Sequence, residues 1–414
     1  LPPCDVYSSN VEYNSANAVV RGGGIYGGNN NVRRTLYTNI DISSPVYANS
    51  EKSSLATVYG AGYGEQTWAE YTLVNLKNGA QVHEVYGGGQ HGMVLNAESI
   101  RDYMKMFSGS VVQSLDELPS HINYEGKLAD WGNAWRDAWR LGDYFNPMSD
   151  DDFNYYPEHM LTNLTNKLLT REAEMDDRDL SGLTGYKKAK IQNKYNTNVI
   201  INKGATVQRY AYGGGLGDAS KPNSGDVLGT TYIALLGGTV GADIYAAGTT
   251  GSVYSLYSAD SSFTASANAY VMGGTVRNVY GGGWRGSVGK HVKTVTKDGV
   301  TSIVQAEISS PYTNDSYGET HVVIGTASGT DYDDGIPSIT RNVYGGGEGG
   351  AIFGTANIKM NNGYIGYRYN SALADDPETA YIDERYVEEL DDAAPGDKLL
   401  ENGGNIFGGG YVAN

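Results

Sequence analysis

Three aspartates in one short loop are the residues best suited to bind an ion. Asp331, Asp333 and Asp334 lie in the run TDYDDG at 330–335, where alternate carboxylates can converge on a hard cation such as Ca²⁺. The loop lacks the later glutamate and the full spacing of an EF-hand. We therefore favour a solvated acidic loop, and Ca²⁺ is the one cofactor that the sequence suggests.

A group of aromatic residues is the best candidate for ligand binding. Three tryptophans recur at helical spacing and three tyrosines follow them: Trp131, Trp135, Trp139, Tyr144, Tyr155 and Tyr156. Trp and Tyr are favoured at interaction hot spots and their rings can stack on sugars, so a protein or a glycan is the expected partner. The alternative, which we favour, is that these rings form the core of the segment that carries them.

No group of residues has the spacing of a catalytic site. Enzymes that cleave polysaccharides need clustered carboxylates, or Lys and Arg beside a Ca²⁺ site. The six histidines are scattered, and Arg277 and Arg341 occupy equivalent positions of a repeat, which indicates a structural role. The other charges within the repeats are Glu84, Arg209, Asp243, Arg285 and Glu348. We therefore expect a protein without catalytic residues.

A repeated pattern must position all of these side chains. A polar residue, a β-branched residue, an aromatic residue and then small residues recur eight times, most clearly as NVYGGG at 278–283 and 342–347. The short steps between copies, 33, 27, 33 and 35 residues, average 32, which is a period typical of solenoids and propellers. The aromatic positions are Tyr26, Tyr59, Tyr86, Tyr212, Tyr245, Tyr280, Tyr344 and Phe407.

Each copy of the repeat predicts three short strands separated by glycine bends. Three strands in about 30 residues fit a parallel β-helix, in which each strand stacks on its equivalent in the next coil about 4.8 Å away. A propeller blade has four strands and a longer period, so it fits less well. We predict a mainly β protein: a parallel β-helix, or β-solenoid, of about eight or more coils with an inserted α-helical subdomain.

Two ladders and two roles for glycine follow from this prediction. The repeated aromatic residues should stack along one edge of the solenoid. Beside them, Asp243, Asn278, Asn342 and Asn405 should form a polar ladder. The glycines should supply positive φ angles and room for close backbone approach at the corners.

The pattern divides the chain into two solenoid segments, 1–96 and 196–414. The segment between them, 97–195, has few glycines and three amphipathic stripes, and we predict a helical subdomain there. Two smaller insertions are expected in the second solenoid segment. One is a β-hairpin near 291–318, and the other is an acidic insertion near 371–400 with a short helix over 377–391.

Composition limits the partners of this chain of 414 residues. Its net charge of −17 argues against nucleic acid, whose phosphates require basic residues. A single cysteine excludes an intrachain disulfide, and no apolar run is long enough for a transmembrane segment. The first residue is Leu rather than Met, and the last residues are a repeat copy without a polar cap. We therefore expect a piece of a longer chain.

The tandem pattern GGTV at 273–276 followed by NVYGGG at 278–283 resembles a family of Gly- and Tyr-rich repeat proteins. These are surface or secreted β-solenoid proteins of gut anaerobes, notably Bacteroidetes. The resemblance covers the solenoid segments and not 97–195, and no functional residues carry over.

The resemblance implies an extracellular location or the bacterial cell surface. It also implies a non-catalytic role as an adhesin, stalk or surface-assembly scaffold that binds a protein or a glycan, or assembles with itself. The alternatives are a polysaccharide-active β-helix enzyme, either a lyase or a hydrolase, and a component of a phage or appendage fibre.

Overall fold

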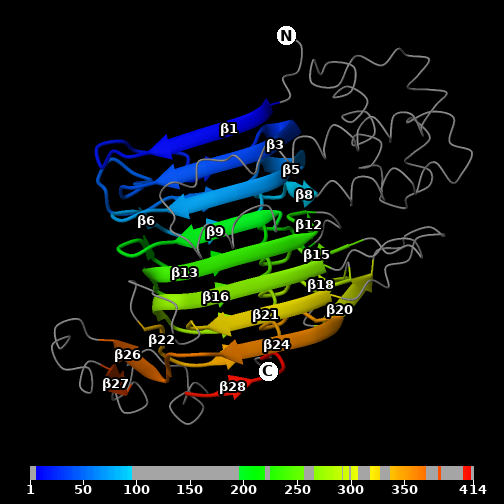
Figure 1. Ribbon diagram of the computed structural model, residues 1–414. Helices are drawn as coiled ribbons and strands as arrows, with labels where there is room; N and C mark the ends of the chain where they lie inside the picture. Colours follow the sequence, from blue (N-terminus) through cyan, green and yellow to red (C-terminus); the bar gives the residue numbers. More distant parts are fainter. Residues whose placement is uncertain are drawn as a thin grey trace, which may run out of the picture.

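A single stack of parallel strands makes up most of the computed structural model (Figure 1). The structure describes residues 6–95, 195–219, 224–255, 265–290, 292–297, 300–305, 318–326, 336–369, 381–383 and 404–411. Within these ranges the chain forms strands and the loops between them, and contains no helix. The mainly β fold predicted from the repeat is therefore confirmed for the described residues.

Eight long strands form the broad face seen in Figure 1. Each long strand pairs in parallel with its equivalent in the neighbouring coil. We number coils 1 to 8 by these strands: β1 Val6–Tyr13, β3 Asn30–Ile42, β5 Tyr63–Leu76, β9 Thr197–Ile201, β13 Thr230–Val240, β16 Ala265–Val276, β21 Gly318–Ile324 and β24 Gly354–Met360.

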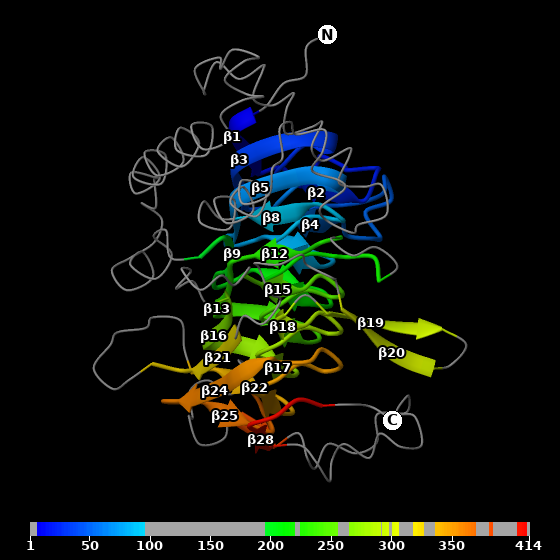
Figure 2. The same ribbon diagram turned by 90° about the vertical axis from the view of Figure 1, so that its right-hand side faces the viewer.

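A second face is formed by the two or three residues that precede each glycine bend. These strands build a separate parallel sheet of eight, and in Figure 2 several of them lie beside the long strands. They are β2 Gly24–Tyr26, β4 Thr57–Tyr59, β7 Val85–Tyr86, β11 Ala211–Tyr212, β14 Ile244–Tyr245, β17 Val279–Tyr280, β23 Val343–Tyr344 and β28 Ile406–Phe407.

A third face follows the glycine bends of coils 3 to 6 and closes these coils. Its strands are β8 Met93–Leu95, β12 Val227–Leu228, β15 Val253–Tyr254 and β18 Val288–Gly289. Short corner strands join the long face to the second face: β6 Gln81–Val82, β10 Thr206–Val207, β22 Ser338–Ile339 and β25 Tyr364–Ile365. Parallel strands around three faces are the arrangement expected of a β-helix.

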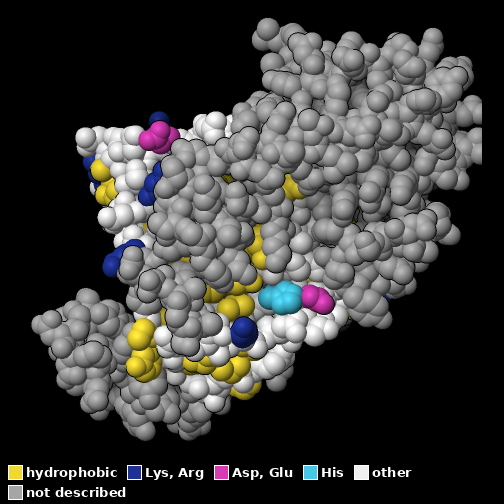
Figure 3. Space-filling model, in the orientation of Figure 1, with side chains coloured by type: hydrophobic (Ala, Val, Ile, Leu, Met, Phe, Trp, Pro, Cys, Tyr) yellow, Lys and Arg dark blue, Asp and Glu magenta, His cyan; other side chains and the backbone are white. Residues whose placement is uncertain are grey.

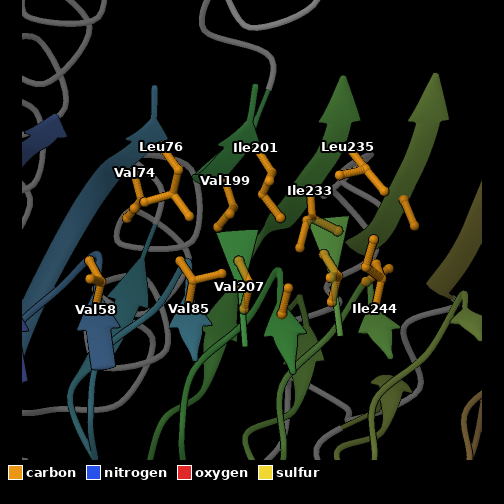
Figure 4. Close-up of a cluster of buried hydrophobic side chains, with 14 of the residues drawn as sticks. Val58, Val74, Leu76, Val85, Val199, Ile201, Val207, Ile233, Leu235 and Ile244 are labelled. Atoms are coloured by element: carbon orange, nitrogen blue, oxygen red, sulfur yellow. The ribbon is translucent and has the colours of Figure 1, made fainter. Parts of the chain in front are cut away.

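The hydrophobic core runs along the solenoid axis as columns of equivalent residues. Side chains alternate between the two faces of a strand, and one-for-one register therefore places each inward side chain above its equivalent. One column runs through all eight coils: Val11, Ile40, Val74, Val199, Ile233, Ala269, Val322 and Ile358. Figure 4 shows residues of the long strands facing Val58, Val85 and Ile244 of the second sheet.

The outer side of the long face carries a second apolar cluster, which the sequence pattern did not predict. It comprises Leu73, Tyr195, Ile200, Tyr232, Ala234, Leu236, Tyr270 and Met272. Hydrophobic side chains are visible on the described part of this face in Figure 3. The ring of Tyr195 stacks on that of Tyr232 with the centroids 4.7 Å apart, so residue 195 already belongs to the solenoid.

Coils 3 and 4 stack directly on each other although residues 96–196 separate β8 from β9. Val74 pairs with Val199 and Tyr86 with Tyr212, and β8 pairs with β12. The solenoid therefore continues without interruption across this gap. The predicted helices of 97–195 lie outside the described residues, apart from Tyr195.

Two antiparallel hairpins lie beside the parallel stack. β19 Val292–Lys297 pairs with β20 Val300–Gln305 and projects from the solenoid in Figure 2. β26 Tyr367–Tyr369 pairs with β27 Tyr381–Asp383. The short helix predicted over 377–391 is wrong at β27, because cross-strand pairing with β26 outweighs local helical preference there.

At the Gly-Gly-Gly bends the structure shows one of the two roles predicted for glycine, room for close backbone approach, and not the other, positive φ. None of the Gly-Gly-Gly residues at 281–283 and 345–347 is among the described glycines with positive φ. They are required because the coils approach closely. A Cβ placed on Gly282 would lie 2.7 Å from the backbone nitrogen of Gly347, and one on Gly346 would lie 2.7 Å from that of Gly410. Close approach, and not backbone conformation, selects glycine at these bends.

We predict that Gly282→Ala lowers the free energy of unfolding by about 1–3 kcal/mol, because the new methyl group must push two coils apart. The matched control is Gly409→Ala, the equivalent position of coil 8, where a Cβ would meet nothing within 4 Å. The control should change the free energy of unfolding by less than about 0.5 kcal/mol. Chemical denaturation of the dilute protein measures both, and equal effects would contradict the explanation.

Candidate functional site

The repeated aromatic residues form one continuous stack on the outside of the second sheet. The residue before each ring, which is valine, isoleucine or, in β11, alanine, points into the core, so the next side chain points outward. Successive rings from Tyr26 to Phe407 are parallel within 12°, and their centroids are 4.7–5.1 Å apart. These contacts agree with the aromatic ladder predicted from the spacing.

Stacking buries rings that would otherwise face solvent. Tyr86, Tyr245 and Tyr280 are 3%, 1% and 3% exposed, whereas Phe407, the last ring, is 40% exposed. Offset aromatic pairs contribute about 0.5–1.5 kcal/mol each beyond their buried area. The stack therefore stabilises the solenoid along its length, and its inner rings present little surface for a ligand.

A polar ladder runs beside the rings, also as predicted. The Oδ1 atom of Asp243 accepts a hydrogen bond from the backbone N–H of Asn278 at 3.1 Å. The side-chain oxygen of Asn278 accepts from the N–H of Asn342, and that of Asn342 accepts from the N–H of Asn405, both at 3.0 Å. Each side chain thus positions the backbone of the next coil.

A column of threonines inside the solenoid was not found from the sequence. Thr72, Thr197 and Thr320 each donate a hydrogen bond across the core to the carbonyl of the first glycine in a bend, at 2.5–2.6 Å. Thr38 and Thr231 make the same bond, the latter to Ala246. The sequence does place a threonine two residues before the core aliphatic residue of these long strands. Threonine is common in strands, however, so this position alone did not indicate the bond.

Three carboxylates gather around the tyrosine hydroxyls near the middle of the stack. Glu84 accepts a hydrogen bond from the Tyr86 hydroxyl at 2.9 Å. Glu348 lies in the bend of coil 7 and accepts a hydrogen bond from the hydroxyl of Tyr245, which belongs to coil 5, two coils away along the stack. Asp243 is the third carboxylate, and all three interact electrostatically with Tyr212. This cluster is the strongest candidate for chemistry among the described residues.

Arg277 neutralises the charge of Asp243, which is the most deeply buried carboxylate of the cluster. Its Nε and Nη2 atoms donate to the two carboxylate oxygens of Asp243 at 2.8 and 2.6 Å, and Asp243 is 2% exposed. The hydrogen bonds to Asp243 raise the pKa of Arg277. A bidentate pair of this kind fixes geometry as well as charge, so Asp243 is held as a structural group.

Glu348 differs from Asp243 because no described side chain forms a bidentate pair with it. Burial raises the pKa of the Glu348 carboxyl above its usual range, and the hydrogen bond from Tyr245 lowers it in part. A carboxyl group with a raised pKa is the form that general acid catalysis requires. The described residues contain no group of three His, Cys, Asp or Glu side chains placed to hold a metal ion.

The predicted ligand and ion sites fall outside the part of the chain that the structure describes. This holds for Trp131, Trp135, Trp139, Tyr144, Tyr155 and Tyr156, and for the Asp331, Asp333 and Asp334 loop. They stay predictions. The convergence of Glu84, Asp243 and Glu348 was not foreseen, because these residues lie up to 264 positions apart in the sequence.

Comparisons with family models, curated proteins and solved structures find no match to this chain. Among the described residues, no helix is long and apolar enough to cross a membrane. What the fold and the site define is therefore a class: a parallel β-solenoid built on a tyrosine stack.

We predict that the protein unfolds in alkali as its stacked tyrosines ionise. Burial, followed by neighbouring charges, raises the pKa of Tyr86, Tyr212 and Tyr245 far above the ordinary value of about 10. A raised pKa in the folded state means that their contribution to stability is complete below about pH 10. That contribution is lost as pH rises further, because the unfolded chain releases these protons first.

The measurement is a titration that follows tyrosinate absorbance and circular dichroism together. Exposed tyrosines should ionise with the fold intact, and a later group should ionise together with loss of the β signal. Ionisation of every tyrosine in a chain that keeps its native dichroism would contradict the prediction.

Proposed function

We propose that this protein is a non-catalytic extracellular β-solenoid that acts as an adhesin, stalk or surface-assembly scaffold. One observation carries the proposal: the side chains that recur from coil to coil fill structural positions. The tyrosines stack, the asparagines bind the next backbone, and the threonines bind the glycine carbonyls. A repeat built in this way makes a rigid rod rather than an open active site.

The extracellular location is part of the same proposal. It is supported by the resemblance to Gly- and Tyr-rich repeat proteins of gut anaerobes such as Bacteroidetes, and the net charge of −17 suits a molecule with much exposed surface. A strongly charged surface favours solubility at high concentration. The 34 tyrosines against 6 phenylalanines suit an elongated molecule with much surface, because tyrosine keeps a polar group for water.

We assign recognition of a surface protein or glycan to the segment 97–194. Successive rungs of the solenoid present nearly the same chemistry, and a repeated surface discriminates poorly between partners. The inserted segment differs in composition and carries Trp131, Trp135 and Trp139. Insertions in solenoids occur in loops and often carry the binding face.

Deletion of 97–194, bridged by a short Gly/Ser linker, should leave a folded β protein that no longer binds its partner. The pairing of Val74 with Val199 and of Tyr86 with Tyr212 supports retention of the fold, because solenoid contacts are mainly between neighbouring coils. The deletion keeps Tyr195, which packs on Tyr232. Circular dichroism tests folding, and binding to a glycan array and to mucin-coated surfaces tests recognition. A folded deletion variant that binds as the full chain does would refute this assignment.

The second candidate function, a polysaccharide-active enzyme, is favoured by the cluster at Glu348. A half-buried carboxyl group with a raised pKa and a carboxylate nearby is the pair that glycoside hydrolysis uses. If the protein is such an enzyme, Glu348→Gln should lower the rate of reducing-sugar release by about 100-fold or more while the fold is retained. Lack of release from a panel of neutral and acidic polysaccharides by the unmodified chain would exclude this candidate.

A further inference from the structure

An exposed tryptophan and an arginine lie together on the bend of coil 6. Trp284 is 37% exposed, and the guanidinium carbon of Arg285 lies 4.4 Å from the centroid of its ring. Arg285 is exposed as well. Stacking uses the flat face of a guanidinium, so the N–H donors in its plane stay available for another partner. The Trp–Arg pair, Trp284 and Arg285, therefore presents an aromatic surface beside a directional set of donors.

The Trp–Arg pair is not part of the repeat. It lies four and five residues after the stacked ring of Tyr280. The equivalent residues are Thr249 and Thr250 in coil 5, and Glu348 and Gly349 in coil 7. Neither neighbouring coil has an aromatic or basic side chain at these positions, so the register of the coils does not require one. The pair gives this bend a chemistry that the adjacent bends lack.

The backbone of the neighbouring coils fixes the Trp–Arg pair in place. The N–H groups of Trp284 and Arg285 donate to the carbonyl oxygens of Gly248 and Thr249 in coil 5, at 3.2 and 2.6 Å. The carbonyl oxygen of Trp284 accepts from the N–H of Gly349 in coil 7 at 2.7 Å. A site that is fixed before binding loses less conformational entropy when a ligand arrives.

Glu348 orients the indole and adds hydrogen-bond acceptors beside it. Its carboxylate accepts hydrogen bonds from the hydroxyl of Tyr245 and from the side chain of Trp284. A carboxylate offers about four acceptor positions, and Glu348 is partly exposed. Hydroxyl groups of a ligand that lies on the indole can therefore donate to the positions that remain.

The charge of Arg285 has no counterion among the described residues. Lys77, Arg277 and His321 form the ion pairs found there. Arg277, for comparison, is bound to both carboxylate oxygens of Asp243. An exposed guanidinium without such a partner can bind a carboxylate through two parallel hydrogen bonds. The donors of Arg285 therefore suit a ligand that carries a carboxylate.

We propose that the Trp–Arg pair binds an acidic sugar, that is, a pyranose ring that carries a carboxylate. The indole of Trp284 stacks on the apolar face of the sugar, and the guanidinium of Arg285 binds its carboxylate. Glu348 accepts hydrogen bonds from the sugar hydroxyls.

The small size of the Trp–Arg pair favours a sugar over a protein partner. A stable protein interface buries about 800 Å² on each side, whereas this site consists of one aromatic side chain and one guanidinium beside small residues such as Thr250 and Gly349. The site lies on the solenoid itself. The inference therefore goes beyond the recognition assigned to 97–194 and holds whether or not that assignment does.

Binding of free sugars to the full chain tests the proposal. The probes are glucuronic acid and galacturonic acid at pH 7, each compared with its neutral parent, glucose or galactose. Free sugars contain no glycosidic bond, so the enzyme activity considered for Glu348 cannot alter them. Saturation-transfer NMR, which observes the sugar, measures the dissociation constants. At least one acidic sugar should bind more tightly than its neutral parent and shift the indole N–H signal of Trp284.

Two variants separate the roles of the ring and the charge. Arg285→Ala should weaken binding of the acidic sugar by about 10-fold or more, because a charged hydrogen-bond donor is lost. It should also remove the preference over the neutral parent. Trp284→Ala should weaken binding of both sugars, because stacking does not depend on the carboxylate. Circular dichroism and thermal unfolding verify that both variants fold.

Arg209→Ala is the matched control. Arg209 is also exposed, and its guanidinium carbon lies 5.1 Å from the ring centroid of Tyr210. The ring of Tyr210 packs against the tyrosine stack, so the control removes the same charge without an exposed aromatic surface. It should bind the sugars as the unmodified chain does.

Three results would overturn the proposal. One is that the unmodified chain prefers neither acidic sugar over its neutral parent. Another is an equal loss of binding in Arg285→Ala and Arg209→Ala, which would show an effect of overall charge. The third is binding that leaves the indole signal of Trp284 unchanged, because the sugar would then lie elsewhere on the molecule.

Discussion

The hydrogen bonds between successive coils are the interaction on which the rest of this structure depends. They fix one residue above its equivalent at the strand spacing of about 4.8 Å, and every column and ladder follows from that register. A slip by one residue would turn Val279 out of the core and Tyr280 into it. The repeated Val-Tyr pair strongly disfavours such a slip, because the core column and the tyrosine stack would be lost together.

This constraint also explains where the solenoid tolerates additions. Stability in such a molecule is close to a sum over neighbouring coils, so a segment can leave between strands if the two coils still meet. The direct pairing of coils 3 and 4 across 96–194 satisfies that condition. The hairpin β19–β20 leaves after β18, and β16 still pairs with β21. The added segments therefore alter the surface while the register is kept.

The sequence predicts the parts of this molecule that depend on the period and not those that depend on distance in space. The spacing of Tyr245, Tyr280 and Tyr344 was sufficient for the stack, since residues at equivalent positions of parallel coils must lie above each other. The bond between Glu348 and Tyr245 crosses two rungs, and no periodicity indicates it. The glycine bends were expected to use both positive φ and close backbone approach, and only close approach is found at the Gly-Gly-Gly bends. Sequence composition cannot distinguish a glycine required for conformation from one required for close approach.

The one-for-one register has a consequence for how such a protein can evolve. Because a coil contacts its neighbours through the same surfaces at every level, duplication or loss of one whole repeat in the gene leaves each remaining interface as it was. The length of the rod can then change in increments of one strand spacing, about 4.8 Å, by recombination between similar repeats. A single substitution at the tyrosine position, in contrast, affects two interfaces at once. In this architecture, changes in the number of coils should therefore be tolerated more readily than substitutions of the repeated aromatic residues.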